Sequence, residues 1–565
     1  LDALPREATA AIALAAIAGD EVDVETLEAC SPAEPDELLL MLEDMCRQRF
    51  LEERVAGRFR FVHALVRDAV LATIGGTRRQ RLHRRLADTL ARRDADPAVV
   101  AHHYVEAGPG SAHDATTWLL AAGRVALESA AWAVAADQFE RALSLADEID
   151  QGCAARVGLG RARRALGDSA AGRAAIEEAL ALARAHRRGR AAAEAALALV
   201  GGGGRGVAID LDDAERATIL RGVLDGLAAD DIDLVVPTLG ELALALVLTD
   251  AKGERDAIAE RCVAEARKTD DADLLAGALL SRRIALMGPD GTEARVADAH
   301  EVLALPRGLV SPERHLSAHL ALVEDLIELG DRPGVDGALT AATDLAARLA
   351  HPYWSWATMT WQALVAIVDG RLDEAEALAF DALGRQAPAE HPEAMATLGV
   401  NLVDIRLFQG RSAEMVELLR SAADANPHIP CYRAVLALCC AEAGDETGAR
   451  DAYGYFAQRD FVLPPDSNWL LSVAVLADVA ATVGDSRGAV VLADALRPFS
   501  DRHVVLNCFG GGGAYWGPVA QHLGRLEALL SNDDRAGDLL DQALASARSF
   551  GAAGFLIRID ALTGS

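Results

Sequence analysis

Apolar and polar residues repeat along the chain with the spacing of an α-helix. Residues 139–143 read Phe-Glu-Arg-Ala-Leu, and residues 176–180 read Ile-Glu-Glu-Ala-Leu, 37 positions later. Apolar residues at the first, fourth and fifth positions of each block fall on one face of a helix. With the helical segments 118–128 and 132–146, this pattern predicts pairs of packed helices that recur along the chain.

A proline and glycine register supports the same interpretation. Both residues recur at an interval of 40 positions, at Pro312, Pro352 and Pro392, at Gly330, Gly370 and Gly410, and again at Gly444 and Gly484. Proline suits the first position of a helix, and glycine suits its exit. Each unit therefore predicts a first helix, a glycine turn and a shorter second helix. We expect an all-α fold, a tetratricopeptide-like α-solenoid.

The first 95 residues follow a different pattern. The expected elements are helices at 4–18 and 35–47, strands at 50–55 and 58–61 around the turn Ala56-Gly57, and helices at 64–74 and 78–92. Short strands on either side of a glycine turn predict a β-hairpin. Helices followed by a terminal hairpin predict a small winged-helix domain over residues 1–95.

Charge is distributed unevenly. The 565-residue chain has a formal net charge of −30, which disfavours a general nucleic-acid-binding surface. Residues 47–93 nevertheless carry 13 arginines against four acidic residues. This segment has two interpretations, a DNA-reading wing or a surface that docks onto an acidic part of the protein, and we favour docking. The docking candidates are Arg60, His63, Arg67, Arg78, Arg79 and Arg81.

Three further regions follow the first domain. Residues 96–200 carry the first repeats, residues 201–211 form a glycine-rich linker, and residues 212–565 continue the solenoid. The run at 201–206 matches GxGxxG, but an alanine-rich helical pattern precedes it instead of a buried strand, so we interpret it as a linker. The chain begins at Leu1, and we expect it to be a fragment or a processed form.

Residues needed for common enzyme chemistry are missing from the expected places. A Walker A loop needs Gly-Lys-Ser/Thr, but Gly253 follows Lys252 and Arg267 precedes Lys268, the only two lysines. His315 and His319 lie one helical turn apart without an HExxH motif, and we interpret them as structural. The eight cysteines form no CxxC, and no signal peptide or transmembrane segment is indicated, so we expect a cytoplasmic protein without cofactor or metal.

Aromatic residues make up only 4% of the chain, and their clusters mark candidate binding positions. In a solenoid the first helix of each pair often lines the concave surface, where such rings could contact a ligand or a peptide. The alternative is that they fill gaps between helices. The candidates are Tyr353, Trp354, Trp356, Trp361, Trp469, Tyr515 and Trp516.

Several short segments resemble one family. They are Arg-Phe-Val-His-Ala-Leu-Val-Arg-Asp-Ala-Val at 60–70, Arg-Gln-Arg-Leu-His-Arg-Arg-Leu-Ala at 79–87, Ala-His-His-Tyr at 101–104, Asp-Ser-Asn-Trp-Leu at 466–470 and Tyr-Trp-Gly-Pro-Val-Ala at 515–520. They look like the region that follows the ATPase core in large bacterial signal-transduction NTPases (STAND ATPases). These regulators carry either a C-terminal LuxR-type helix-turn-helix or an N-terminal nucleotide-cyclase domain.

The resemblance implies a division of labour. An upstream ATPase acts as the switch, the winged helix packs against it and relays its state, and the repeats sense a small-molecule inducer or a protein partner. We therefore expect a non-enzymatic regulatory module of a transcriptional regulator, which reaches DNA only through another domain. The alternatives are a protein–protein interaction scaffold and the sensor arm of a nucleotide cyclase.

Overall fold

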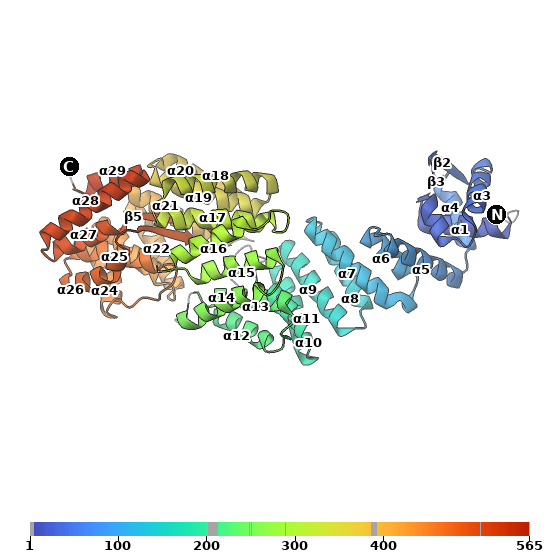
Figure 1. Cartoon of the computed structure of the whole chain (residues 1–565), viewed down its shortest axis with the longest axis horizontal. Coiled ribbons are helices and arrows are strands. Elements are labelled where there is room, and N and C mark those ends of the chain that lie inside the picture. The colour runs from blue at the N-terminus through green and yellow to red at the C-terminus, as the bar shows by residue number, and fades with distance from the viewer. Residues whose placement is uncertain are drawn as a thin grey trace. The chain divides into compact units, whose positions relative to one another are not determined.

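The computed structural model describes residues 5–201, 213–247, 249, 251–288, 290–385, 392–508 and 510–563. Nearly all regular structure in these ranges is helical (Figure 1). The chain divides into two compact units, residues 1–199 and 200–565, which are described separately. The predicted all-α solenoid is confirmed, with two small sheets added to it. Among the described residues, no helix is both long enough and apolar enough to cross a membrane.

The first unit begins with a small mixed domain. Its elements are α1 (Arg6–Ala18), β1 (Glu21–Asp23), α2 (Val24–Cys30), α3 (Pro35–Arg47), β2 (Leu51–Val55), β3 (Arg58–Phe61), α4 (Ala64–Thr73) and α5 (Gly76–Arg92). The three strands form an antiparallel sheet in the order β1-β3-β2. The predicted hairpin is therefore present, whereas sequence reasoning missed β1 and α2.

Alternation along β3 fixes which face of the sheet is buried. Phe59 and Phe61 are buried in the core of this domain, whereas Arg58 and Arg60 are exposed. Successive strand residues point to opposite faces, so one face seals the core and the other presents arginine to solvent. Gly57 makes the hairpin turn with φ of +79°, a conformation that favours glycine.

Helical pairs fill the rest of the first unit. They comprise α6 (Pro97–Glu106), η1 (Pro109–Ser111), α7 (Ala112–Glu128), α8 (Trp132–Leu145), α9 (Ile149–Ala165), α10 (Ser169–Ala185) and α11 (Gly189–Val200). Phe139 of α8 lies between Gly123 of α7 and Gly158 of α9. A Cβ added at either glycine would lie within 2.6 Å of the Phe139 ring. Small residues thus allow the close helix approach that the repeat requires.

The second unit continues the helical pairs. Its helices are α12 (Asp213–Leu224), α13 (Ile232–Ala245), α14 (Lys252–Ala266), α15 (Ala272–Ala285), α16 (Thr292–Ala304), α17 (Pro312–Glu328), α18 (Arg332–Leu349), α19 (Pro352–Val368), α20 (Leu372–Gly384), α21 (Pro392–Phe408), η2 (Ser412–Met415), α22 (Val416–Ala425), α23 (Pro430–Glu442), α24 (Glu446–Ala457), α25 (Trp469–Val483), α26 (Ser486–Leu496), η3 (Arg497–Phe499), α27 (Val519–Leu529), α28 (Asp533–Phe550) and α29 (Ala553–Thr563).

The proline and glycine register marks helix starts and exits as expected, but the second helix of its first unit is not shorter, since α18 has 18 residues and α17 has 17. Helices α17, α19 and α21 each begin at the proline of the register. The register glycines take positive φ at the turn that follows the first helix, between +69° for Gly410 and +78° for Gly370 and Gly484. A left-handed residue of this kind ends a helix, and glycine adopts it without steric cost.

A second sheet interrupts the helical repeats near the C-terminal end. Strands β4 (His503–Cys508) and β5 (Gly511–Pro518) form an antiparallel hairpin. β4 packs on α17 and α25, and β5 packs on α19, α21 and α28, so helices distant in sequence surround the hairpin (Figure 1). The hairpin includes an all-glycine run, in which Gly510 is a turn residue and Gly511–Gly513 begin β5.

The proposed domain boundaries stay predictions. The structure separates the chain at residue 199/200, and this division does not test the boundary expected at residue 95. The glycine-rich linker predicted at 201–211 lies, apart from Gly201, outside the described residues.

Candidate functional site

The docking candidates lie on three elements of the first domain. Arg60 is on β3, His63 caps α4, Arg67 is on α4, and Arg78, Arg79 and Arg81 are on the first turns of α5. All except Arg67 are exposed. Their role in docking stays a prediction, but the structure does give solvent access to most of these side chains.

Two of the six have intramolecular roles. The Arg67 Nε donates a hydrogen bond to the main-chain oxygen of Ala16 at 2.9 Å, and its Nη1 lies 3.0 Å from a carboxylate oxygen of Asp20. The Nδ1 of His63 accepts a hydrogen bond from the Leu65 amide and caps the start of α4. These contacts attach α4 to α1 and stabilise the helix start, as capping does.

The remaining arginines make few or no polar contacts with other side chains. Arg79 lies 3.8 Å from Glu106, whereas the side chains of Arg60, Arg78 and Arg81 form no hydrogen bond or ion pair with any described residue. Leu65 on α4 is 70% exposed. The described part of this domain therefore presents these three arginines without an intramolecular partner, and an exposed leucine on α4.

The aromatic candidates of α19 lie in the core of the second unit. Tyr353, Trp354, Trp356 and Trp361 are all buried, Trp361 completely. Tyr353 packs edge-on against Trp354 and lies 5.4 Å from the Trp356 ring centroid. In this conformation the rings fill space between helices, and contact with a ligand or partner stays a prediction.

Two of the other three candidates are part of the C-terminal hairpin, and the third is at the start of α25, which packs on β4. Tyr515 and Trp516 are buried residues of β5, and Trp469 is a partly exposed residue at the start of α25 that contacts Phe499. The Tyr515 hydroxyl is 2.8 Å from the Nδ1 of His503 on β4. The fold thus brings the α19 group and the β5 pair to one hairpin, while Trp469 contacts Phe499 beside it.

Helices α19 and α21 bind the main chain of β5 through side chains. Trp361 donates its indole N–H to the Gly510 oxygen at 3.2 Å, and the Thr360 hydroxyl accepts from the Gly512 amide at 3.1 Å. Asn401 donates to the oxygens of Gly512 and Gly513 at 2.9 and 2.7 Å. These contacts satisfy the strand edge, which has no further strand beside it in the part of the chain that the structure describes.

Asp404 extends the same polar row one turn along α21. Its Oδ2 accepts a hydrogen bond from the Tyr515 amide at 3.0 Å. Burial raises the pKa of Asp404 to about 7, although the Tyr515 amide and Arg558 favour the charged form. Such a group changes protonation near neutral pH, which makes the base of the hairpin a titrating position.

A second buried carboxylate holds the indole of Trp516. Asp478 on α25 accepts from the Trp516 N–H at 3.0 Å, from His522 at 3.1 Å and from Arg525 at 2.7 Å. Burial alone would raise the pKa of Asp478, but His522, Arg525 and the indole hold it well below its usual range. The other nitrogen of His522 lies 3.0 Å from the Trp516 main-chain oxygen, so both ring nitrogens have polar partners.

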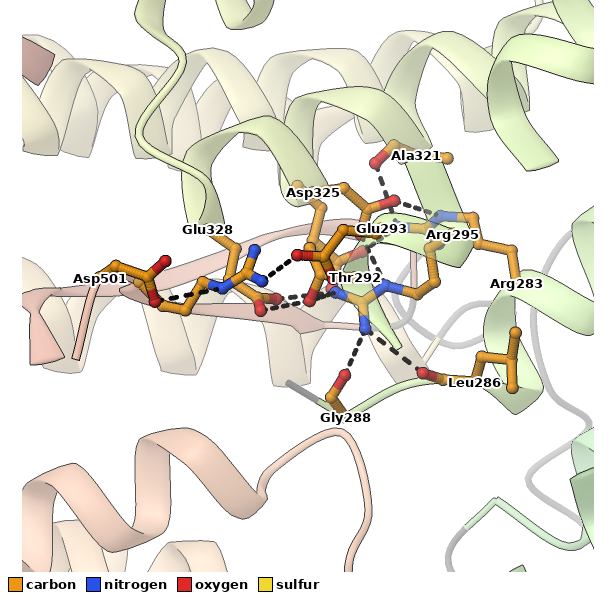
Figure 2. Close-up of polar contacts among 12 residues, drawn as sticks. Arg283, Leu286, Gly288, Thr292, Glu293, Arg295, Ala321, Asp325, Glu328 and Asp501 are labelled. Carbon is orange, nitrogen blue, oxygen red and sulfur yellow. Dashed lines mark hydrogen bonds and ion pairs between the residues drawn. The ribbon is translucent and has the colours of Figure 1, made fainter. Parts of the chain in front are cut away.

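An ionic network links α15, α16 and α17 (Figure 2). Arg295 on α16 is at its centre. Its Nε lies 2.7 Å from Asp325, its Nη2 lies 2.7 Å from Glu328, and its Nη1 donates to the Gly288 oxygen at 2.6 Å. Further contacts reach Thr292 and the Leu286 oxygen. All three guanidinium nitrogens therefore have acceptors, which fixes the α15–α16 turn against α17.

The network has more acidic than basic members. Arg283 on α15 contacts Asp325, Glu324 and the Ala321 oxygen, so two buried guanidinium groups face three buried carboxylates. Burial raises the pKa of Glu328, against the opposing effects of Arg295 and Thr292. Buried charges of this kind are costly when one partner is lost, so the network specifies how these repeats pack.

Arg502 connects this network to the hairpin. It immediately precedes β4 and forms an ion pair with Glu293, which adjoins Thr292 at the start of α16. The main-chain oxygen of Arg502 also accepts from the Val519 amide after β5. The base of the hairpin is thus attached to repeats far earlier in the chain, since the Arg502–Glu293 pair spans 209 positions.

Sequence reasoning did not identify these buried polar groups. A local signal existed in one case, since Asn401 and Asp404 share one helix face with Thr397 at spacings of four and three. The partners of Arg295 and Asn401 could not be found this way, because they lie in other repeats.

Two kinds of reactive group can be assessed among the described residues, metal-ligand clusters and cysteine thiols. Among the described residues, no three His, Cys, Asp or Glu side chains are arranged to hold a metal ion. His315 and His319, the pair predicted to be structural, belong to no such group. Burial raises the pKa of Cys262 and of Cys439 to about 12, so both thiols stay protonated at neutral pH and are poor nucleophiles.

Comparison with known proteins gives likenesses in structure only. No protein-family model matches the chain, and no curated protein matches it in sequence. Among solved structures, a Signal Transduction ATPase with Numerous Domains (STAND) protein with a tetratricopeptide repeat sensor, from Pyrococcus horikoshii, is 12% identical over 85% of this chain, with a TM-score of 0.40. This chain covers 65% of that protein, less than two thirds of its length.

Two other solved structures are similar to this chain. A chain of the APC/C hetero-tetramer Cut9-Hcn1 is 13% identical to this chain, with a TM-score of 0.45. The match covers 95% of this chain and 92% of that chain. Yeast Tom70 is 11% identical over 86% of this chain and 96% of its own, with a TM-score of 0.31. At these scores the likenesses carry no argument about ligands or partners.

Proposed function

We propose that this chain is the non-catalytic relay and sensor part of a cytoplasmic bacterial signal-transduction ATPase of the STAND type. Residues 1–95 act as a winged-helix relay that docks onto an upstream ATPase domain. The helical repeats bind an inducer or a protein partner and control the output of the whole protein, which is transcription in the LuxR-type members that the sequence resembles.

One observation carries the docking part of this proposal. Arg60, Arg78 and Arg81 are exposed on one small domain and form no ion pair with the described residues, although the whole chain has a net charge of −30. Exposed Leu65 adds apolar area to the same domain. Uncompensated arginines in an acidic chain favour a partner surface that supplies carboxylates.

The test uses the natural reading frame upstream of Leu1. The segment that it encodes is expressed separately and mixed with this chain, and the affinity is measured by calorimetry. The triple variant Arg60→Glu, Arg78→Glu, Arg81→Glu should weaken the complex at least about tenfold, equivalent to about 1.4 kcal/mol. Arg450→Glu, at an exposed position of α24, is the matched control. Equal affinity for the triple variant would reject the docking surface.

A scaffold without a sensing function is the second candidate. It is favoured by the burial of Tyr353, Trp354, Trp356 and Trp361, which leaves these rings inaccessible to an inducer in this conformation. A thermal-shift screen with metabolites separates the two functions, because a ligand that binds the native state raises the melting temperature. Stable protein complexes without any such metabolite would favour the scaffold.

A further inference from the structure

A pocket lies between the small mixed domain of the first unit and α6. Its volume is about 370 Å³. Its apolar side is formed by Val22 of β1, Leu86 and Leu90 of α5, and Val99 of α6. Val22 and Leu86 are buried, whereas Val99 is 44% exposed. Pockets that bind small molecules have volumes of about 300–1,000 Å³, so this one has the size for a small ligand.

Charged side chains line the other side of the pocket. Glu21 and Asp23 are two positions apart on β1, so their side chains point to the same face of the sheet. Arg58 is directly opposite Asp23 in the β1–β3 register. Its Nη1 lies 3.6 Å from a Glu21 carboxylate oxygen, which makes an ion pair but is too long for a hydrogen bond. Two carboxylates and one guanidinium therefore share the rim.

These charged groups have capacity for further hydrogen bonds. Among the described residues, neither the Glu21 carboxylate nor the Arg58 guanidinium takes part in a hydrogen bond. Asp23 is held in place by α2, since its Oδ1 accepts from the Thr26 amide at 2.7 Å and its Oδ2 from the Thr26 hydroxyl at 2.8 Å. A carboxylate oxygen can accept more than one hydrogen bond, so Asp23 is an oriented acceptor with lone pairs left.

The placement of these groups restricts the chemistry of a ligand. An ammonium group pairs with the two carboxylates, and a carboxylate pairs with Arg58. An aliphatic chain fits the leucine and valine side chains on the opposite side. None of the residues that line the pocket is aromatic, which favours an aliphatic ligand over one with a ring to stack. A small molecule that combines all three features is an α-amino acid with an aliphatic side chain.

We propose that this pocket binds a free aliphatic α-amino acid. The ammonium group contacts Glu21 and Asp23, the carboxylate contacts Arg58, and the side chain lies on the leucine and valine surface. This inference goes beyond the proposed function, which places an inducer or a partner on the helical repeats and not in the pocket of the first unit.

The ligand would connect two parts of the first unit. Arg58 is on β3 of the mixed domain, whereas Val99 is on α6, which packs on α5 and α7. A ligand that contacts both sides binds the folded arrangement and not the unfolded chain, so it stabilises that arrangement. Amino-acid binding should therefore raise the melting temperature of the chain.

Isothermal titration calorimetry of the full chain tests the ligand class. The probes are L-leucine, L-isoleucine and L-valine, and at least one should bind saturably. Two truncated analogues of leucine should bind about tenfold more weakly or not at all. They are isopentylamine, which lacks the carboxylate, and isocaproate, which lacks the ammonium group. Failure of all three amino acids to bind at millimolar concentration, or equal binding of leucine and its analogues, would overturn the proposal.

Two conservative variants test the contacts. Arg58→Gln and Glu21→Gln should each weaken amino-acid binding about tenfold, because each removes a charge that faces the zwitterion. Arg54→Gln is the matched control, since Arg54 on β2 pairs with Glu52 at 2.9 Å and does not line the pocket. Its affinity should equal that of the unaltered chain. The same affinity in all three variants would reject the charged rim as the binding site.

Hydrogen exchange with and without the amino acid locates the site. Saturating ligand should slow exchange in β1, in β3 and at the start of α6, and should leave α12 to α14 of the second unit unchanged. Slowing confined to the second unit would overturn the pocket and would instead support an inducer site on the repeats. Neither outcome bears on docking by the first domain, which the arginine variants test separately.

Discussion

The Nδ1 atoms of His83 and His103 lie 3.0 Å apart in the core of the first unit, between α5 and α6. Both rings are buried, and only one of the two nitrogens can donate to the other. The pair is therefore satisfied with one proton between these atoms, and a second proton there would place two donors face to face.

This geometry predicts a loss of stability on acidification. Burial lowers the pKa of His83 to about 4 and that of His103 to about 3. Glu106 opposes the shift at His83, and His102 and Arg79 add to it there. The unfolded chain takes up protons below about pH 6.5, and the folded chain does not. Stability should be fully present above about pH 6.5 and should fall as the pH drops toward about 4.

Urea unfolding of the full chain at several pH values measures the effect. Each histidine should contribute about 1.4 kcal/mol per pH unit within this window. Carboxylates elsewhere also titrate, so the comparison that matters is between the unaltered chain and His103→Gln, in which one titrating ring is removed. Identical slopes for the two proteins would show that the pair does not control the acid response.

Substitution of Arg295 should lower the unfolding free energy more than substitution at most other positions of the second unit. Arg295→Met removes one guanidinium partner from each of Asp325 and Glu328, which stay buried and keep, among the described residues, only Arg283 and the Thr292 hydroxyl, respectively. We expect a loss of about 3–5 kcal/mol in unfolding free energy, measured by chemical denaturation.

Arg411 supplies the matched control for this experiment. It pairs with Glu414 at 2.7 Å, but both side chains are about half exposed. Arg411→Met should therefore cost about 0–1 kcal/mol, since water screens exposed pairs. Similar losses of unfolding free energy for the two variants would mean that burial does not determine how much the Arg295 contacts stabilise the chain.

The register glycines allow backbone strain to be separated from steric contact. Gly410 and Gly370 share positive φ, but a Cβ at Gly410 meets nothing within 4 Å, whereas one at Gly370 lies 3.1 Å from the Gly554 main chain. Gly410→Ala should cost about 1–2 kcal/mol from the left-handed backbone alone. Gly370→Ala should cost more, and thermal unfolding of both variants checks the order. A smaller loss at Gly370 would contradict the contact with α29.

Trp356 tests whether the aromatic group of α19 is structural. Its side chain is 1% exposed and packs within the core of α17, α19 and neighbouring helices. Trp356→Ala should therefore destabilise the chain by about 3–5 kcal/mol. Trp469→Ala, at a partly exposed ring, should cost much less. Full stability of Trp356→Ala with loss of partner binding would instead identify a binding residue.

The helical pairs could be predicted because their signals are local. Pro312 and Gly330 mark the start and exit of α17, and the same spacing recurs in the next two repeats. A helix start needs a fixed φ, and a helix exit needs a left-handed residue, and both requirements are met by single residues. The β2–β3 hairpin followed from equally local evidence, a glycine turn between two short strands.

The β4–β5 hairpin could not be predicted in the same way. The segment at 510–513 is entirely glycine, which has low strand propensity, and its partners Asn401 and Trp361 lie 111 and 149 residues away. Strand formation there depends on side chains of two other repeats. No pattern within the segment carries that information.

The sequence by itself determined the periodic part of this protein, its paired helices and their turns, together with the β2–β3 hairpin and the arginine-rich segment at 47–93, because helix starts, glycine turns and charge are properties of neighbouring residues. Only the tertiary structure decided which buried side chains from different repeats contact one another. Stacking brings Thr360, Trp361 and Asn401 to one strand and Arg295 to Asp325 and Glu328. Long-range packing places these polar groups in a core. Because they are buried there, the loss of a contact costs more free energy than it would at the surface.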